Sequence, residues 1–312
     1  MTFVSKIPRW LKVSVGFLVL AALIMQLEWS ALYDGVQMVR WPIIGAAAAV
    51  YPVAILLNAA KWSAALRLHD LSFQFVYLLR VGCIGFFVNN LLPSAIGGDI
   101  YRVYRSSMGR ATSQAISAVV VERLVGLSAL LLNGLVGAIL LLGSSSLARI
   151  YLIMCLGGLV VACLVGTIIG ASHSKVSSTL ERSRRLQPVI ANLRRIARPH
   201  SAWPALIGYS IAFQLTAAGA TLLAFVAVGA DLTASQALLV TVAAGLAAVL
   251  PISISGIGVV EGSIVGAGIA LGVDYDTAFL AAIVLRALSL ATSLGCGIVY
   301  AFEGGRRSVQ AV

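Results

Sequence analysis

One phrase occurs twice in this chain, and it limits the folds that the chain can adopt. Residues 91–99 read LLPSAIGGD and residues 250–262 read LPISISGIGVVEG, each a Leu-Pro followed by small residues, glycines and an acid inside a long apolar stretch. Proline and glycine interrupt helices, and bilayer hydrocarbon offers no hydrogen-bond partner to the freed backbone groups. Broken backbone at membrane depth is therefore tolerated where protein or a watery cavity surrounds it. Two breaks at corresponding positions of two halves predict a binding site of the transporter type.

The composition indicates a membrane protein. Hydrophobic residues make up 60% of the chain and charged residues only 11%, whereas a soluble domain carries about 25% charged residues. We therefore expect an all-α polytopic membrane protein in which residues 1–312 form a single integral membrane domain. The net charge of +11 does not indicate a nucleic-acid partner, because Lys and Arg lie between the apolar stretches, where positive-inside topology places them. The four cysteines lie singly without metal-ligand spacing, so we expect no metal and no other cofactor.

The charges that flank the apolar stretches predict how the chain crosses the membrane. Basic residues should lie on the cytoplasmic side, which places both termini and the basic loop 172–201 there, in a cell inner (plasma) membrane. Basic residues flank 81–100 on both sides and acidic residues flank 237–272 on both sides. We therefore expect each of these segments to enter and leave on one face, as a re-entrant hairpin. The six full spans that we expect are about 10–27, 41–60, 116–142, 147–171, 203–228 and 277–302.

The order of these segments predicts an internal repeat. Two spans, a hairpin and a third span occupy about 10–142, and the same order starts from the opposite face at about 147–302. This is an inverted-topology repeat, in which the two hairpins enter from opposite faces and meet near the midplane. We therefore expect Pro93–Gly98 to approach Pro251–Gly258 in space.

Charged residues inside apolar stretches are costly, at about 2.5–3.5 kcal/mol each on insertion scales, and they often mark function. Arg123 and Arg286 each follow a break, where a hairpin of the same half could reach them. A guanidinium binds phosphate with a forked geometry and stays charged. Helix N-termini at Gly97–Gly98 and Gly256–Gly258 would present bare N–H groups to the same anion. The pattern predicts a pocket for a phosphorylated lipid head group. The acids that we expect as counter-charges are Asp99, Glu122 and Glu261.

Several of these residues also have a structural interpretation. Asp99 and Glu261 would then only neutralise the arginines, as buried acid–base pairs often do. An enzyme is not expected. An intramembrane aspartyl protease needs a second transmembrane aspartate beside Asp99, and a serine nucleophile in Ser253–Gly256 needs a base, whereas all three histidines lie in loops.

The polar residues on each side of the first break can be interpreted in two ways. Asn89 and Asn90 precede the break and either touch a substrate or cap freed carbonyl groups. Arg102 and Arg105 are spaced i, i+3 on the predicted cytoplasmic side, next to tyrosines. They either form an interfacial belt that grips anionic lipid or serve only as a topology signal.

The two breaks also carry the motifs of a known family. The first motif is Phe-Phe-x-Asn-x-Leu-Pro, a Gly pair, a basic segment and Glu-Arg-Leu, and it stands here as Phe86, Phe87, Asn89 or Asn90, Pro93, Gly97, Gly98, Arg102, Arg105, Glu122, Arg123 and Leu124. The second is Leu-Pro-x-Ser-x-x-Gly-x-Gly-x-x-Glu-Gly, and it stands here as Leu250, Pro251, Ser253, Gly256, Gly258, Glu261 and Gly262. Over nearly its whole length, the chain resembles the lysylphosphatidylglycerol synthase transmembrane family, the flippase-like membrane domain of the multiple peptide resistance factors.

This resemblance implies a stand-alone flippase-like protein without the soluble aminoacyltransferase domain, so lysyl transfer to lipid is not expected. We expect the protein to move a lipid with a phosphate-bearing head group between leaflets, by alternating exposure of a central polar pocket. One alternative is an accessory protein that presents lipid to a lipid-modifying enzyme, and another is an ion-coupled transporter of a small solute. The expected substrate-binding residues are Asn89, Asn90, Pro93, Gly97, Gly98, Asp99, Arg102, Arg105, Glu122, Arg123, Pro251, Ser253, Gly256, Gly258, Glu261 and Arg286.

Overall fold

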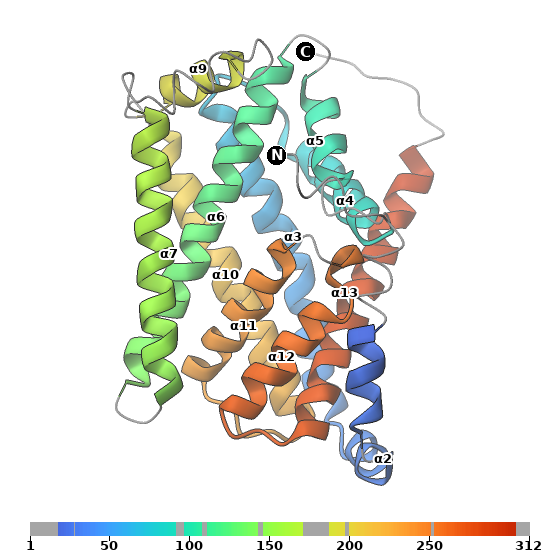
Figure 1. Ribbon diagram of the computed structural model, residues 1–312. Helices are drawn as coiled ribbons and strands as arrows, with labels where there is room; N and C mark the ends of the chain where they lie inside the picture. Colours follow the sequence, from blue (N-terminus) through green and yellow to red (C-terminus); the bar gives the residue numbers. More distant parts are fainter. Residues whose placement is uncertain are drawn as a thin grey trace.

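The fold is helical throughout the part of the chain that the computed structural model describes. The described residues are 18–27, 29–91, 97–107, 111–142, 146–170, 187–196, 200–250 and 253–303. Every regular element within these ranges is a helix (Figure 1). This confirms the predicted all-α fold class.

Within the described ranges, five helices are long and apolar enough to cross a membrane. Each contains at least 18 residues of high mean hydropathy, close to the ~20 residues that span a hydrocarbon core. They match five of the six predicted spans and confirm a multi-pass membrane protein. Residues 10–17 of the remaining predicted span, 10–27, lie outside the described ranges, and its described part is helical at 18–25. The five long helices are α3 (Trp41–Arg67), α6 (Thr112–Leu140), α7 (Ser146–Gly170), α10 (Ala202–Ala227) and α13 (Tyr275–Glu303).

Each Leu-Pro phrase falls between two shorter helices. The first separates α4 (Phe75–Leu91) from α5 (Gly97–Ser107), and the second separates α11 (Ala234–Val249) from α12 (Val259–Ala270). The longest of the four has 17 residues and so measures about 25 Å, less than the ~30 Å of a hydrocarbon core. Besides the segment 18–25, the remaining helical segments of the described residues are α2 (Trp29–Gln37), α9 (Gln187–Ile196) and the short 3₁₀ turn η2 (Ile254–Gly256).

The long helices form the frame on which the two broken segments pack. Helix α3 packs against α10, and α6 lies against α7, α10 and α11. Figure 1 shows α4 and α5 toward one end of this frame and α11 and α12 toward the other. The core has separate apolar clusters at these two ends, one around Trp62 and Leu206 and one around Phe225 and Val265.

Small residues allow the helices to approach closely. A Cβ on Gly134 of α6 would lie 2.6 Å from Val242 of α11 and 2.8 Å from Cys155 of α7. Close approach through small residues is a common way to pack helices in membranes, where the hydrophobic effect contributes little between helices. Helix α6, which follows the first break, is therefore held on two sides.

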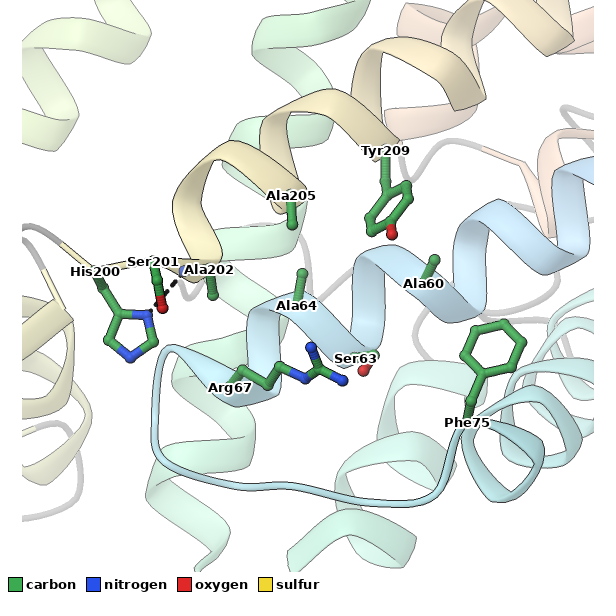
Figure 2. A pocket seen from close by; sticks show the side chains of 10 residues that line it. All are labelled: Ala60, Ser63, Ala64, Arg67, Phe75, His200, Ser201, Ala202, Ala205 and Tyr209. Atoms are coloured by element: carbon green, nitrogen blue, oxygen red, sulfur yellow. Dashed lines mark hydrogen bonds between the residues drawn. The ribbon is translucent and has the colours of Figure 1, made fainter.

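The structure corrects one helix boundary. The predicted second span ends at residue 60, because Lys61 follows it, but α3 continues to Arg67. Lys61 is only 6% exposed and pairs with Glu122, so the charge that was expected to end the span lies inside the bundle. A cavity of about 220 Å³ lies beside the same end of α3, against α10 and not between the two breaks (Figure 2).

Candidate functional site

The first break is closed by a hydrogen bond between α4 and the start of α5. The backbone N–H of Gly98 donates to Oδ1 of Asn89 at 2.7 Å. A side chain at Gly98 would collide with the carbonyl oxygen of Gly85 and would come within 2.8 Å of the Asn89 amide, so only glycine lets the two helices meet here. The side chain of Asn90 donates to the carbonyl of Phe86 at 3.1 Å, within its own helix. Pro93 lies outside the described residues.

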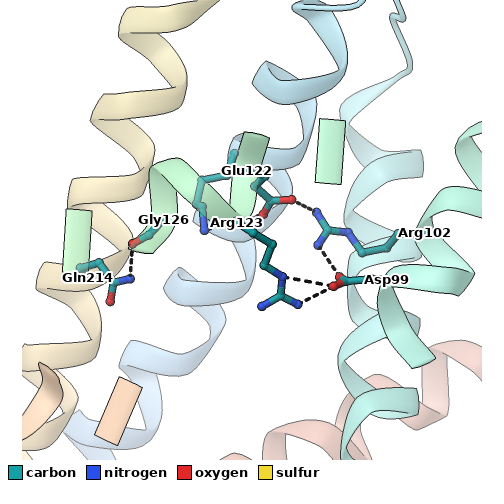
Figure 3. A network of polar contacts seen from close by, with 7 residues as sticks. Asp99, Arg102, Glu122, Arg123, Gly126 and Gln214 are labelled. Atoms are coloured by element: carbon teal, nitrogen blue, oxygen red, sulfur yellow. Dashed lines mark hydrogen bonds and ion pairs between the residues drawn. The ribbon is translucent and has the colours of Figure 1, made fainter. Parts of the chain in front are cut away.

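Five charged residues from three helices form one connected group, called the charge cluster below; Figure 3 labels four of them, and Lys61 is the fifth. Asp99, in the first turn of α5, accepts from Nε and Nη2 of Arg123 at 3.1 and 2.6 Å and from Nη1 of Arg102 at 3.4 Å. Nη2 of Arg102 donates to Glu122 at 2.6 Å. Lys61 of α3 lies 3.7 Å from the other oxygen of Glu122. The charge cluster thus joins α3, α5 and α6 at the first break.

The charge cluster has more positive than negative groups. Its members are three cations and two carboxylates, so it carries one excess positive charge when all five are ionised. Two cations lie over aromatic rings: Arg102 is 4.2 Å from the ring of Trp62, and Lys61 is 4.6 Å from the ring of Phe213. Aromatic faces attract cations without supplying a negative charge. The excess charge therefore remains for an anion outside the cluster.

Arg123 is the member of the charge cluster that an anion could reach. The side chains of Lys61, Arg102 and Glu122 are at most 8% exposed, whereas that of Arg123 is 59% exposed. Figure 3 shows two nitrogens of Arg123 bonded to Asp99 and the third without a bond to the residues drawn. Arg123 lies 11 residues from the start of α6, about 17 Å along the helix. An exposed cation at that depth faces water or an anion rather than hydrocarbon.

The structure corrects the predicted role of Arg102 as an interfacial or topology-signal residue. For Arg105 it confirms only that aromatic rings lie nearby. Arg102 is buried in the charge cluster, so it is neither an interfacial belt residue nor a simple topology signal. Arg105 is partly buried, and its guanidinium lies 5.7 Å from the ring of Tyr77 and 5.8 Å from that of Tyr101. The hydroxyl of Tyr77 also donates to the Arg105 carbonyl at 2.8 Å. Arg105 therefore has the predicted aromatic neighbours but lies outside the charge cluster.

The second break has a similar but smaller arrangement. The N–H of Gly258 donates to Glu261 at 2.7 Å, and the other oxygen of Glu261 accepts from Nε of Arg286 in α13. Arg286 also donates to the carbonyl of Ser255 at 3.3 Å. Ser255 and Gly256 both have positive φ, 51° and 73°, a conformation that glycine adopts readily and serine rarely. Glu261 is 2% exposed and the side chain of Arg286 is 18% exposed, so this acid–arginine pair is balanced in charge, with the acid buried and the arginine partly exposed.

The two breaks meet in space. The hydroxyl of Ser255 in η2 donates to the carbonyl of Asn89 in α4 at 2.8 Å and lies 3.5 Å from that of Asn90. This contact joins Ser255 to two residues that precede the predicted stretch Pro93–Gly98. Pro93 and Pro251 lie outside the described residues, so the closer approach of Pro93–Gly98 to Pro251–Gly258 stays a prediction. The hydroxyl of Ser253 is buried and has no hydrogen-bond partner among the described residues. Ser253, two residues before Ser255 in the chain, therefore has unused hydrogen-bonding capacity.

The expectation of bare N–H groups at the two helix starts is wrong at Gly98 and Gly258. The side chain of Asn89 already accepts a hydrogen bond from the N–H of Gly98, and that of Glu261 accepts one from the N–H of Gly258. These two N–H groups are therefore not available to an anion. The expectation that Asp99 and Glu261 pair with the arginines is confirmed. Gly97 is the first residue of α5.

Sequence reasoning missed Lys61, although a signal was present. Lys61 is followed by further apolar residues, in the stretch KWSAAL, so the apolar pattern of α3 continues beyond the charge. A lysine inside an apolar pattern calls for a buried partner, and Glu122 is that partner. Outside the charge cluster, Gln214 of α10 donates to the carbonyl of Gly126 at 3.1 Å (Figure 3).

Comparison with known protein families supports the family resemblance that the two motifs indicate. A family model described as "Lysylphosphatidylglycerol synthase TM region" matches residues 9–297. The match includes both breaks, the charge cluster and Arg286. Neither the curated proteins nor the solved structures include a significant match to the chain.

Proposed function

The chain belongs to the lysylphosphatidylglycerol synthase transmembrane family, and we propose that it moves a lipid with a phosphate-bearing head group between the two leaflets of the membrane. The observation that carries this proposal is the exposed Arg123 in the middle of a spanning helix, within a cluster that has one excess positive charge. A phosphodiester carries one negative charge and would balance that excess. The proposed activity is transport without a chemical reaction and without a cofactor.

The proposed binding mode uses Arg123 as the anchor of the phosphate. A guanidinium offers planar donors that match two phosphate oxygens. Asp99 holds Arg123 in place, and Arg102 connects Asp99 to the buried Glu122. The second break would contribute through Arg286, which is 18% exposed, and through the unpartnered hydroxyl of Ser253.

We propose that the two broken segments are re-entrant hairpins of an inverted repeat. In each half, an acid on the helix after the break pairs with an arginine on the next long helix: Asp99 with Arg123, and Glu261 with Arg286. The separations along the chain are 24 and 25 residues. This repeated relation supports a shared architecture, in which hairpins from opposite faces alternately expose the charge cluster.

This topology predicts the sides from which single cysteines are labelled. In a protein without its four native cysteines, Tyr104→Cys and Arg195→Cys should react only from the cytoplasm, and Asp231→Cys only from outside. Tyr104 is 75% exposed, whereas Ser106 in the same helix is 1% exposed and would label poorly. A membrane-impermeant maleimide on intact cells, before and after permeabilisation, measures this. Labelling of Tyr104→Cys from outside would rule out the hairpin and the repeat together.

Transport should depend on Arg123 much more than on an arginine outside the cluster. Arg123→Gln should slow the transfer of fluorescent phosphatidylglycerol across reconstituted vesicles by roughly 10- to 100-fold, because hydrogen bonds to charged groups contribute about 1.5–3 kcal/mol. Arg149→Gln, at an exposed position of α7, is the matched control and should transport normally. Normal transport by a monodisperse Arg123→Gln protein would exclude the anchor.

The alternative functions give different results in the same vesicles. An accessory protein that presents lipid to a lipid-modifying enzyme would bind phosphatidylglycerol through Arg123 without transferring it. An ion-coupled solute transporter would show no dependence on the lipid head group. We assign the protein to the inner (plasma) membrane with both termini cytoplasmic, because the basic segments between its helices follow the positive-inside rule.

A further inference from the structure

A cavity at the end of α3 carries chemistry that the proposed transport does not use. It lies between α3 and the start of α10, with Phe75 of α4 at its edge, and has a volume of about 220 Å³. Figure 2 shows Arg67, Ser63 and Tyr209 around it. Lys61 of the same helix belongs to the charge cluster, and Trp62 contacts it. The cavity is therefore a second place on α3, separate from the charge cluster.

The polar groups of the cavity are suited to an anion. Its described lining residues include one permanent cation, Arg67, and the hydroxyls of Ser63, Ser201 and Tyr209, but no carboxylate. Nδ1 of His200 accepts the N–H of Ala202 at 3.0 Å, so a neutral His200 ring carries its proton on Nε2 and can donate. A guanidinium that shares a cavity with hydroxyl and imidazole donors provides the kind of groups that bind phosphate.

The position of the cavity indicates a lipid as the source of that phosphate. Arg67 is the last residue of α3, and Ser201 immediately precedes α10. Both helices are long enough to cross the membrane, so their ends lie where lipid head groups lie. The rest of the lining is apolar, with four alanines and Phe75, and would contact glycerol and the first acyl carbons. The volume is below the ~300 Å³ at which pockets for whole drug-sized ligands begin, so a head group fits and a complete lipid does not.

We propose that this cavity binds the phosphate of a phospholipid in the leaflet at the C-terminal end of α3. The head group contacts Arg67, His200 and the hydroxyls, while the acyl chains remain in the bilayer beside α3 and α10. This goes beyond the proposed transport, because the site is formed by other residues and holds whether or not Arg123 carries a lipid across.

A local labelling measurement tests the proposal independently of transport. Ser63→Cys is placed in a protein without native cysteines, and its reaction with a small thiol reagent is timed in detergent. Dioctanoyl phosphatidylglycerol should slow the reaction at least fivefold, whereas dioctanoylglycerol, which lacks the phosphate, should not. Adding Arg67→Gln should remove the protection, and Arg67→Lys should keep part of it. Adding Arg149→Gln or Arg123→Gln should leave the protection intact.

The other outcomes each overturn the proposal. Equal protection by dioctanoylglycerol would show an apolar groove that does not recognise phosphate. Protection by millimolar inorganic phosphate alone, matching that of the lipid, would assign the site to free phosphate. Absence of protection in a monodisperse Ser63→Cys protein would exclude the site. Loss of protection with Arg123→Gln would show that the cavity and the charge cluster form one site. None of these results decides whether the protein transports lipid.

Discussion

Glu122→Gln is expected to lower the free energy of unfolding by roughly 3–5 kcal/mol, the usual cost of removing one partner from a buried ion pair. Glu122 is 4% exposed and accepts a hydrogen bond from Arg102 while facing Lys61. Without its charge, two buried cations would face each other with only Asp99 to offset them. The loss should appear as a lower melting temperature of the purified protein and a smaller monodisperse fraction on size exclusion.

A second substitution separates charge from packing in this result. Lys61→Met removes one of the two cations, so the double variant Lys61→Met/Glu122→Gln should recover a large part of the lost stability. Asp231→Asn, at an exposed position, should change stability by less than about 0.5 kcal/mol. If Glu122→Gln alone unfolds like the unmodified protein, the charge cluster does not hold α3, α5 and α6 together.

Gly98→Ala is the second substitution with a large expected effect. The added methyl group would collide with the backbone carbonyl of Gly85 and with the Asn89 amide. A backbone atom in a helix cannot move aside as a flexible side chain can, so the cost should reach or exceed the ~3 kcal/mol upper end of ordinary overpacking. The shift of α5 would also displace Asp99, and lipid transfer should fall together with the melting temperature.

Gly82→Ala is the matched control on α4. A Cβ at Gly82 has no neighbour within 4 Å, and alanine favours a helix by about 1 kcal/mol relative to glycine. The melting temperature of Gly82→Ala should therefore stay the same or rise, and transfer should be unchanged. Equal stability of Gly98→Ala and Gly82→Ala would contradict the close contact between α4 and α5.

Much of the fold can be predicted because membrane spans leave a strong pattern. Length and hydropathy are enough to predict the five long helices, and proline with glycine marks both breaks. The apolar stretch KWSAAL indicates that α3 continues beyond Lys61, but the partner that holds Lys61 in the interior, Glu122, could not be predicted from the residues of α3. That partner is distant in the sequence, and pairing between helices does not appear in local hydropathy.

The site was predictable to different degrees in its two halves. Glu261 follows Gly258 by three residues, the spacing at which a helix side chain caps the N–H at its own start, so the occupied donor at Gly258 could have been inferred. Gly98 is capped by Asn89 from a preceding helix, which depends on how α4 and α5 pack. The burial of Arg102 has the same cause, since its charge pairs with α6.

The charge count of the cluster has a consequence for the membrane potential. The charge cluster would carry one net positive charge when empty and none with a singly charged phosphodiester bound. A unit charge that crosses the full field changes in energy by about 2.3 kcal/mol per 100 mV. The lipid-bound protein would then switch between its two open states with little sensitivity to voltage. An inside-negative potential would favour the return of the empty protein to the state that is open to the cytoplasm. In the proposed transport, the resting voltage of the cell would in this way give lipid movement a direction.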